Sequence, residues 1–320
     1  MKDILESLCR REDLSSDDTR DVFARVIAGD LDDIEIASLV TALKAKGETP
    51  DEVAGAASAL RAAAADFPAP SYACADTCGT GGDGKQTVNI STAVALVAAE
   101  MGIPIVKHGN RSVSSKCGSA DVLESVNLEA PADVARRCLD ETNICFLFAP
   151  HYHAGVRHAM PVRRKLATRT IFNLLGPLVN PAAPQFQVMG VYDPDLCRPA
   201  AETLGLLGCE SALVVHGSGL DEIALHGPTH AARFSDGHVE ELEITPSDAG
   251  LDAFPLDALA GGEPEENARW FRRVLAGEGS EAHRAAIAIN AGALALVTGR
   301  ADTLHDGAHM ALETLASGRA

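Results

Sequence analysis

The sequence lacks the features that mark a zinc module or a nucleic-acid binder. Its eight cysteines include no pair of CxxC knuckles, and their scattered spacing is that of thiols in a reducing cytosol. Basic residues are outnumbered, 27 against 45 acidic ones, which gives a formal net charge of −18. A sequence-independent nucleic-acid binder needs a broad basic surface to displace counterions, so we expect no nucleic-acid partner.

Long apolar runs are also lacking. The longest, near 92–99 and 285–297, are too short to cross a bilayer. The first sixteen residues carry Asp, Glu and Arg throughout, unlike the leader of a secreted protein. We therefore expect no membrane partner and a cytoplasmic location. With 320 residues, 46% of them apolar, the chain is globular and long enough for about two domains.

Capping patterns predict three short helices at the start of the chain, over 15–29, 32–47 and 49–65. Each begins at a Ser, Asp or Thr whose side chain can accept hydrogen bonds from first-turn amides, and two have Glu three positions later. The prolines of 67–70 then break the helical pattern. We interpret residues 1–70 as a small helical domain.

Short apolar runs alternate with helical segments after residue 70. Four of them are predicted strands, at 103–107, 144–149, 186–192 and 211–216. A tight turn is expected at 235–238, and closing helices at 285–297 and 303–316. Alternation of this kind is typical of parallel sheets. The sequence thus predicts an α/β protein: a small helical domain and a larger α/β domain over 71–320, with a mostly parallel central sheet flanked by helices.

Three segments rich in glycine, serine and threonine lie within 76–84, 89–92 and 107–119. Glycine lets backbone amides approach an anion closely, and a hydroxyl at a helix start adds a donor. The first segment has neither the dinucleotide fingerprint nor the Walker pattern. Taken alone, the first segment has a tight turn as its less favoured interpretation, whereas the second is equally a plain helix cap.

The third segment is harder to explain as a solvated loop. Lys107, Arg111 and Lys116 lie among four serines and two glycines within thirteen positions. Cations and hydroxyls at this density suit an anion, and the two preceding segments are close enough in sequence to face the same one. Together the three segments predict a ligand with several phosphates.

Three other groups have weaker patterns. Asp221 and Glu222 follow an apolar run; adjacent acids are commonly solvated, but beside a pyrophosphate pocket their oxygens suit Mg²⁺. His151 and His153 have no third ligand at a usual interval, which favours a structural or substrate-lining role. Arg163 lies in a basic stretch. Either this stretch is simply a surface helix, or an arginine in it binds a carboxylate through its planar guanidinium group.

From about Asp13 to the C-terminus, the chain closely resembles the anthranilate phosphoribosyltransferase family. The resemblance rests on a set of strings that is specific only as a set. They are Gly-Thr-Gly-Gly-Asp at 79–83, Asn-Ile-Ser-Thr at 89–92, Lys-His-Gly-Asn-Arg at 107–111, Arg-Thr-Ile-Phe-Asn-Leu-Leu-Gly-Pro at 169–177 and Gly-Leu-Asp-Glu at 219–222.

The resemblance implies transfer of phosphoribose from 5-phosphoribosyl 1-pyrophosphate (PRPP) to the amine of anthranilate, in tryptophan biosynthesis. It further implies two Mg²⁺ ions per active site and a homodimer formed through the small helical domain, which takes in a return segment near 160–185. No obligatory nucleophile is implied, and His108 is only a candidate proton acceptor.

Site residues carried over from the family fall into three sets. Anthranilate would contact Gly79, Asn110 and Arg163, with Arg163 facing its carboxylate. Mg²⁺ would be held by Ser91, Asp221 and Glu222. PRPP would contact Gly79, Gly82, Asp83, Thr87, Asn89, Ile90, Ser91, Thr92, Lys107, Gly109, Arg111, Ser114, Ser115 and Ser119.

The chain departs from the family at 151–156, where His-Tyr-His-Ala-Gly-Val replaces the usual His-His-Pro-Ala-Met, and at 167–168, where Ala-Thr replaces Gly-Ile. The first strip borders the expected anthranilate channel. Two alternatives fit the sequence less well. A pyrimidine nucleoside phosphorylase shares the fold but usually has a Ser-Thr-Gly-Gly-Val-Gly-Asp loop. A non-catalytic nucleic-acid-binding relative would need a long basic groove.

Overall fold

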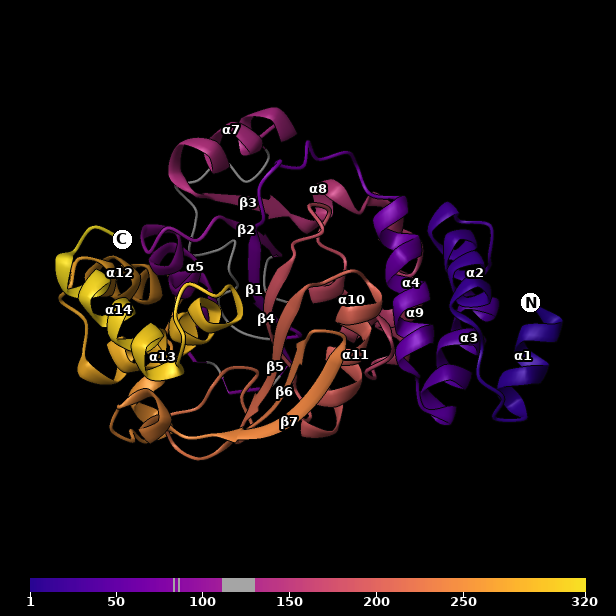
Figure 1. Cartoon of the computed structure of the whole chain (residues 1–320). Coiled ribbons are helices and arrows are strands. Elements are labelled where there is room, and N and C mark those ends of the chain that lie inside the picture. The colour runs from indigo at the N-terminus through magenta and orange to yellow at the C-terminus, as the bar shows by residue number, and fades with distance from the viewer. Residues whose placement is uncertain (83, 86, 111–129) are drawn as a thin grey trace.

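A computed structural model describes residues 1–82, 84–85, 87–110 and 130–320. Helices near the N-terminus lie at one end of the molecule, a twisted sheet lies in the middle, and the last helices of the chain lie beyond it (Figure 1). The predicted α/β architecture, with a small helical part and a mostly parallel sheet flanked by helices, is confirmed.

The three predicted N-terminal helices are present as α2 (Ser16–Ala28), α3 (Asp33–Lys46) and α4 (Pro50–Ala62). Capping boxes begin α3 and α4, as the sequence indicates. A further helix, α1 (Lys2–Cys9), precedes them and was not predicted. Leu8 is its one buried residue, but Ile4, Leu5 and Leu8 follow helical spacing, so the sequence did carry a usable signal for this helix.

In the described part of the chain the sheet has seven strands in the order β3-β2-β1-β4-β5-β6-β7. β1 to β5 are parallel, and β6 and β7 are antiparallel. The bounds are β1 Ala75–Gly79, β2 Ile105–Gly109, β3 Ile144–Phe148, β4 Phe186–Gly190, β5 Ser211–Gly217, β6 Thr229–Ser235 and β7 His238–Ile244. The four predicted strands are β2 to β5. β1 was not predicted, because its residues were interpreted as part of a glycine loop.

The hairpin between β6 and β7 turns as expected. Asp236 and Gly237 have φ of 52° and 78°, the left-handed values that a two-residue hairpin turn with matching twist requires.

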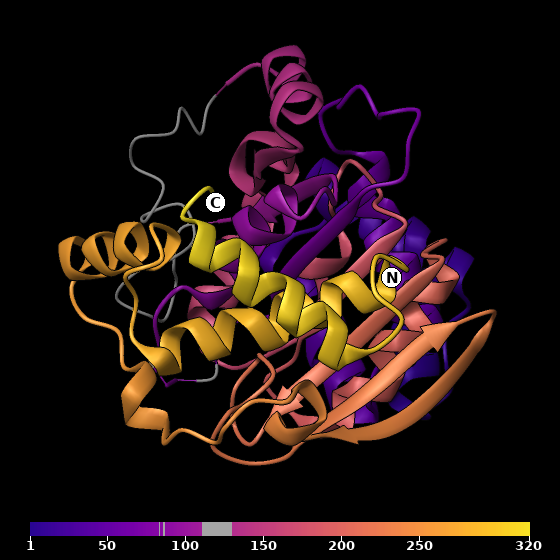
Figure 2. The ribbon, with the colours of Figure 1, turned by 60° about the vertical axis from the view of Figure 1, so that its left-hand side comes forward.

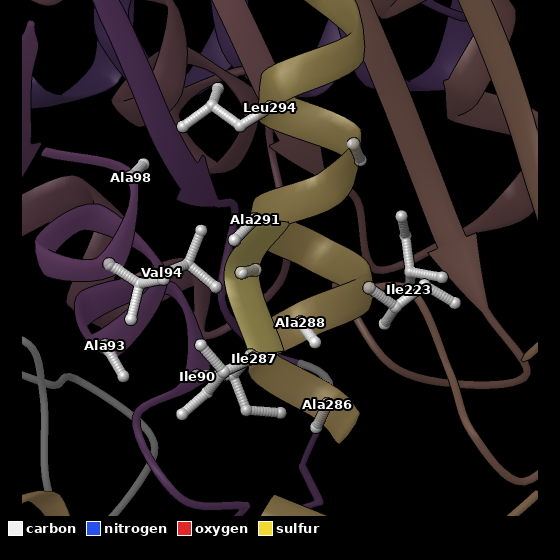
Figure 3. Close-up of a cluster of buried hydrophobic side chains, with 14 of the residues drawn as sticks. Ile90, Ala93, Val94, Ala98, Ile223, Ala286, Ile287, Ala288, Ala291 and Leu294 are labelled. Carbon is white, nitrogen blue, oxygen red and sulfur yellow. The ribbon is translucent and has the colours of Figure 1, made fainter. Parts of the chain in front are cut away.

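Helices cover both faces of the sheet (Figure 2). On one face lie α5 (Ile90–Glu100), α12 (Pro264–Leu275), α13 (Glu281–Val297) and α14 (Leu304–Ser317), where Ile90 and Val94 pack with Ile287 and Ala291 (Figure 3). The other face carries α10 (Phe172–Leu178), α11 (Cys197–Leu206) and, beyond them, the N-terminal helices. α7 (Ala132–Thr142) packs on β3. Alternate residues of each strand pack on the two faces of the sheet, because successive side chains of a strand point in opposite directions.

The small helices between β3 and β4 return to the N-terminal bundle. α8 (Ala149–Tyr152) and a 3₁₀ helix over Ala154–His158 lead into α9 (Met160–Leu166). α9 packs on α3, and α10 packs on α4. Helices far apart in sequence therefore share one apolar cluster with the face of the sheet that α10 and α11 cover.

Arg61 of α4 donates hydrogen bonds to the C-terminal ends of two other helices. Its Nε donates to the Leu178 carbonyl at 2.8 Å, and its Nη1 donates to the Leu207 carbonyl at 3.2 Å. Both acceptors lie at helix C-termini, where carbonyls lack partners within the helix and a cation is favoured by the dipole. Burial lowers the pKa of Arg61.

Replacing Arg61 with Met is expected to lower the free energy of unfolding by about 1–3 kcal/mol, since two carbonyls lose a charged donor. Urea denaturation followed by circular dichroism measures this. Arg20→Met is the matched control, because Arg20 lies on α2 with 49% of its side chain exposed. An Arg61→Met variant as stable as the control would show that Arg61 does not tie the layers together.

Candidate active site

The sheet order places a topological switch point between β1 and β4. On one side of this point the strands follow in the order β1, β2, β3 toward the sheet edge. On the other side they follow in the order β4, β5. Ligands of open parallel sheets bind at the carboxyl ends of the strands beside such a point. Here those ends are Gly79 of β1 and Gly190 of β4, and the predicted glycine loop begins at the first of them.

Three strand-end glycines make room for the Asp221–Glu222 loop. A Cβ on Gly79 would lie 2.1 Å from the Asp221 Oδ2 atom, and one on Gly190 would lie 1.6 Å from the Asp221 carbonyl oxygen. A Cβ on Gly217 would lie 2.2 Å from the Glu222 carbonyl oxygen. All three distances are far below van der Waals contact, so the two carboxylate residues lie directly on the ends of β1, β4 and β5.

Asn290 of α13 fixes this loop from the side of the helical layer. The Ile223 amide donates to Asn290 Oδ1 at 3.0 Å, and Asn290 Nδ2 donates back to the Ile223 carbonyl at 3.3 Å. Asn290 is 1% exposed, and Ile223 packs beside α13 (Figure 3). The buried amide thus holds the residue next to the carboxylate pair at both of its backbone groups.

The structure brings together the three residues assigned to the metal. Ser91 Oγ donates to Glu222 Oε1 at 2.5 Å, and the Gly81 amide donates to Asp221 Oδ2 at 2.7 Å. Burial, and then the Asp221 charge, raise the pKa of Glu222 to about 8. A divalent cation would relieve that repulsion, and hard oxygen donors suit Mg²⁺ rather than zinc.

Further metal ligands are not supplied by the described residues, among which no cluster of three His, Cys, Asp or Glu side chains forms. Two carboxylates with substrate phosphates are the usual protein share of a Mg²⁺ site. The residues present therefore fit the ion.

Lys107 and His108 occupy successive positions of β2 and are almost fully buried, at 2% and 4% exposed. Lys107 Nζ donates to the Thr77 carbonyl at 2.7 Å. His108 Nδ1 lies 3.2 Å from the Gly176 carbonyl oxygen, and its Nε2 has no hydrogen-bond partner among the described residues. Burial lowers the pKa of His108 to about 3, so the ring is neutral at pH 7 and carries its proton on Nδ1.

The buried His108 predicts acid sensitivity. Its folded pKa lies below the unfolded value of about 6.5, so the unfolded chain binds the extra proton as pH falls from about 6.5 toward 3. Stability present above that window is lost within it, by at most about 1.4 kcal/mol per pH unit. Unfolding midpoints measured from pH 7 to 4 should fall less steeply for His108→Asn. Parallel profiles for the two proteins would contradict this account.

Arg163, the residue assigned to the acceptor carboxylate, lies on α9 in an apolar setting. Its guanidinium carbon is 5.5 Å from the centre of the Phe172 ring, and Nη1 is 3.8 Å from the Met160 sulfur. Burial lowers its pKa. Asn110, its proposed partner in binding anthranilate, is exposed just after β2.

The PRPP residues are only partly covered by the structure. Asp83, Arg111, Ser114, Ser115 and Ser119 lie outside the described residues. Gly82 has a φ of 80°, and Gly109 ends β2. Asn89 and Thr92 lie at the start of α5, and Thr87 pairs with Ala260. Ile90 is 2% exposed, and its amide donates to the Val88 carbonyl at 2.8 Å.

Several residues of the site were not assigned a role from the sequence. Arg169 donates to the Gly82 carbonyl, and its guanidinium carbon lies 3.9 Å from the centre of the Tyr192 ring. It begins the Arg-Thr-Ile-Phe-Asn string, which was a usable signal. Asn290 also had a usable sequence signal, because it is the lone side-chain amide within an apolar helical run.

The segment 151–156, whose sequence departs from the family pattern, packs against the N-terminal bundle. Its 3₁₀ helix contacts α2, and a Cβ on Gly155 would lie 2.3 Å from the Ile27 side chain. Gly155 therefore permits the close contact between this strip and α2.

Comparisons with known proteins agree with this arrangement. Residues 2–64 match the helical bundle domain of a glycosyl transferase family, and residues 71–320 match its a/b domain. An anthranilate phosphoribosyltransferase of Sorangium cellulosum is 62% identical over 100% of this chain and 92% of the relative. The chain belongs to the anthranilate phosphoribosyltransferase family.

Solved structures extend the likeness. The anthranilate phosphoribosyltransferase of Thermus thermophilus superposes with a TM-score of 0.94 at 42% identity, covering 99% of this chain and 95% of that one. The yeast enzyme solved with PRPP and Mg gives 0.87 at 26% identity, covering 99% and 93%. Membership in the anthranilate phosphoribosyltransferase family makes the chain a pentosyltransferase and decides against the nucleoside phosphorylase alternative. In the described residues no helix is long and apolar enough to cross a membrane.

Proposed function

We propose that this protein transfers the phosphoribosyl group of PRPP to the amine of anthranilate, giving N-(5-phosphoribosyl)anthranilate and pyrophosphate in tryptophan biosynthesis. The observation that carries the proposal is the contact between the glycine loop, Ser91 and the Asp221–Glu222 pair at the ends of β1, β4 and β5. Amide donors and paired carboxylates at one switch point suit a diphosphate and its cation.

On the donor side, the glycine loop and the first turn of α5 hold the phosphates, and Lys107 faces the pyrophosphate. Ser91, Asp221 and Glu222 would hold Mg²⁺, and the ion would supply positive charge to offset the negative charge of the pyrophosphate. The bond from the anomeric carbon to the pyrophosphate oxygen breaks, and that oxygen keeps the electron pair. Because positive charge builds on the ribose, fixed donors around the leaving group lower the barrier without a nucleophile.

On the acceptor side, Arg163 binds the anthranilate carboxylate through its planar fork, and Asn110 and Gly79 complete the contact. This aligns the amine lone pair with the anomeric carbon, where the new carbon–nitrogen bond forms. The amine nitrogen then loses its extra proton to water. His108 is neutral, and its buried Nε2 atom has no hydrogen-bond partner among the described residues, but its low basicity argues against a role as an obligatory base.

We further propose two Mg²⁺ ions per site, a cytoplasmic homodimer, and a smaller domain made of residues 1–70 with a return segment near 160–185. The packing of α9 on α3 and of α10 on α4 supports the return segment. The scattered free cysteines of the described chain support a reducing compartment. Sedimentation velocity tests the dimer.

The experiment that tests the function follows anthranilate fluorescence with purified protein, PRPP and Mg²⁺, beside mixtures without PRPP or with EDTA. The proposal predicts loss of fluorescence only in the complete mixture, with one pyrophosphate released per anthranilate consumed. Fluorescence that persists in the complete mixture would contradict it.

Asp221→Asn is expected to raise the Mg²⁺ concentration for half-maximal activity about tenfold, since a charged ligand is lost at about 1.4 kcal/mol. Mg²⁺ titration of the initial rate measures this. Asp195→Asn serves as the control, because Asp195 lies exposed near the start of α11. An unchanged metal dependence in Asp221→Asn would remove Asp221 from the metal site.

A further inference from the structure

Three successive residues of the glycine loop are held by three different segments of the chain. The Thr80 amide donates to the carbonyl of the last residue of β4 at 2.9 Å. The Gly81 amide donates to Asp221 Oδ2 at 2.7 Å, and the Gly82 carbonyl accepts from the Arg169 guanidinium. The first two contacts belong to the site already described. The third comes from the loop between α9 and α10, which is part of the return segment to the N-terminal bundle.

The Gly82 carbonyl is a group that an anion site has to direct elsewhere. A loop of this kind binds phosphate through its backbone amides, whereas a carbonyl oxygen carries partial negative charge and repels the ligand. Gly81 and Gly82 have φ of 66° and 80°, and glycine peptides rotate with little steric hindrance. A hydrogen bond to the Gly82 carbonyl therefore fixes which way this peptide group faces before the ligand arrives.

The Arg169 side chain is exposed, but the ring of Tyr192 holds its guanidinium in place. The guanidinium carbon lies 3.9 Å from the centre of that ring, as in a stacked cation–π contact. Tyr192 lies two residues beyond β4, and the amide of the intervening Val191 donates to the Val215 carbonyl of β5 at 2.9 Å. The aromatic ring is thus carried by backbone that is bonded to the sheet.

The backbone that carries Arg169 is anchored on the helical side. The loop between α9 and α10 begins with Ala167 in the left-handed region, at a φ of 47°. The Ala167 amide donates to the Arg163 carbonyl at 3.2 Å, and Thr168 Oγ1 accepts from Lys44 Nζ of α3 at 2.6 Å. Arg169 therefore reaches the glycine loop from a turn that is bonded to α9 and α3 by contacts of its own.

We propose that Arg169 is a positioning residue for the donor half of the reaction. Its guanidinium, stacked on Tyr192, fixes the Gly82 carbonyl and so keeps the amides of the glycine loop available to the phosphates of PRPP. The segment that carries Arg163 for the acceptor thereby also shapes the loop that binds the donor. The inference rests on the proposed function for the identity of the anion, whereas the contacts of Arg169 with Gly82 and Tyr192 are independent of it.

Arg169→Met should weaken the binding of inorganic pyrophosphate with Mg²⁺ about tenfold and raise the KM for PRPP by a similar factor, because the loop loses a charge-assisted hydrogen bond. The KM for anthranilate should change less than about threefold, since Ala167 and Thr168 keep their contacts with α9 and α3. Calorimetry measures the affinity, and initial rates with each substrate varied separately provide the Michaelis constants.

Arg164→Met is the matched control, because Arg164 is an exposed arginine of α9. It should leave the affinity for pyrophosphate and both Michaelis constants within about twofold of wild type, as expected for a surface charge. Equal changes of the two Michaelis constants in Arg169→Met, or wild-type affinity for pyrophosphate, would overturn the proposal.

Two variants of Tyr192 separate its ring from its hydroxyl group. Tyr192→Phe keeps the ring and should bind pyrophosphate within about twofold of wild type. Tyr192→Leu removes the ring and should weaken binding about three- to fivefold, as expected for an exposed cation–π contact. In an Arg169→Met background, Tyr192→Leu should change the affinity less than about twofold, because the ring acts through Arg169. Fully additive effects would contradict the stacking part of the proposal.

Hydrogen exchange followed by mass spectrometry tests the contact without a ligand. The Thr80 and Gly81 amides are hydrogen-bonded, so they exchange when the loop opens. Arg169→Met should speed their exchange about tenfold and leave the amides of β5 at the wild-type rate. Unchanged exchange in the glycine loop would overturn the proposal. Wild-type protein that bound no pyrophosphate would instead count against the proposed function, and the exchange rates would still decide whether Arg169 holds the loop.

Discussion

Gly190→Ala is expected to reduce kcat/KM for transfer about 100-fold or more, because the new methyl group would displace the carboxylate loop. A Cβ at this position would lie 1.6 Å from the Asp221 carbonyl oxygen and 2.3 Å from its carbon. Backbone atoms cannot rotate away as a side chain can, so Asp221 and Glu222 must shift together. A shift of about 1 Å at catalytic groups is enough for a loss of this size.

Steady-state kinetics and Mg²⁺ titration of Gly190→Ala should show the loss of rate together with weaker metal dependence. Gly205→Ala is the matched control. Its Cβ would lie 2.4 Å from the Phe234 ring, a side chain on β6, so it should lower stability while leaving the affinity for Mg²⁺ near that of wild type. Wild-type activity in Gly190→Ala would mean that the loop is not seated on β4 as described.

Arg163→Ala should raise the KM for anthranilate about 30-fold while changing the KM for PRPP less than about threefold. A bidentate guanidinium–carboxylate contact in an apolar setting is worth about 2–3 kcal/mol. The guanidinium carbon lies 5.5 Å from the centre of the Phe172 ring, and lysine offers no planar fork, so Arg163→Lys should recover only part of the loss. Initial rates with each substrate varied separately provide both constants.

Arg164→Ala is the control for general loss of positive charge on α9, since Arg164 is exposed on the same helix. It should leave both Michaelis constants within about twofold, as expected for a surface charge. If Arg163→Ala instead raised the two constants equally, Arg163 would act on the whole site, and the anthranilate assignment would be wrong.

Local sequence patterns predicted the structure correctly where the stabilising interactions join residues close in sequence. Each helix start that carries a capping box, such as Thr49 with Glu52, is decided by residues three positions apart. The turn at Asp236 and Gly237 likewise depends on the φ values those two residues tolerate. The chemistry of adjacent carboxylates pointed to Asp221 and Glu222 as metal ligands, and the resemblance added Ser91. The structure places Ser91 in contact with Glu222, next to Asp221.

Long-range contacts were beyond sequence reasoning. β1 is short and ends in glycine, so its strand character depends on pairing with β4, more than a hundred positions away. Asp76 meets Asn180 across 104 positions, and Asn290 meets Ile223 across 67. In each case one buried polar side chain satisfies another group that only the fold brings near. Neither neighbouring sequence nor periodicity specifies such a partner.

The most direct test of the site is a crystal structure of the protein with PRPP and Mg²⁺. The account predicts the pyrophosphate over the 79–82 loop and beside Lys107, with metal bound by the Asp221 and Glu222 carboxylates at about 2.1 Å. Pyrophosphate bound away from the ends of β1 and β4, or metal held by other side chains, would contradict it.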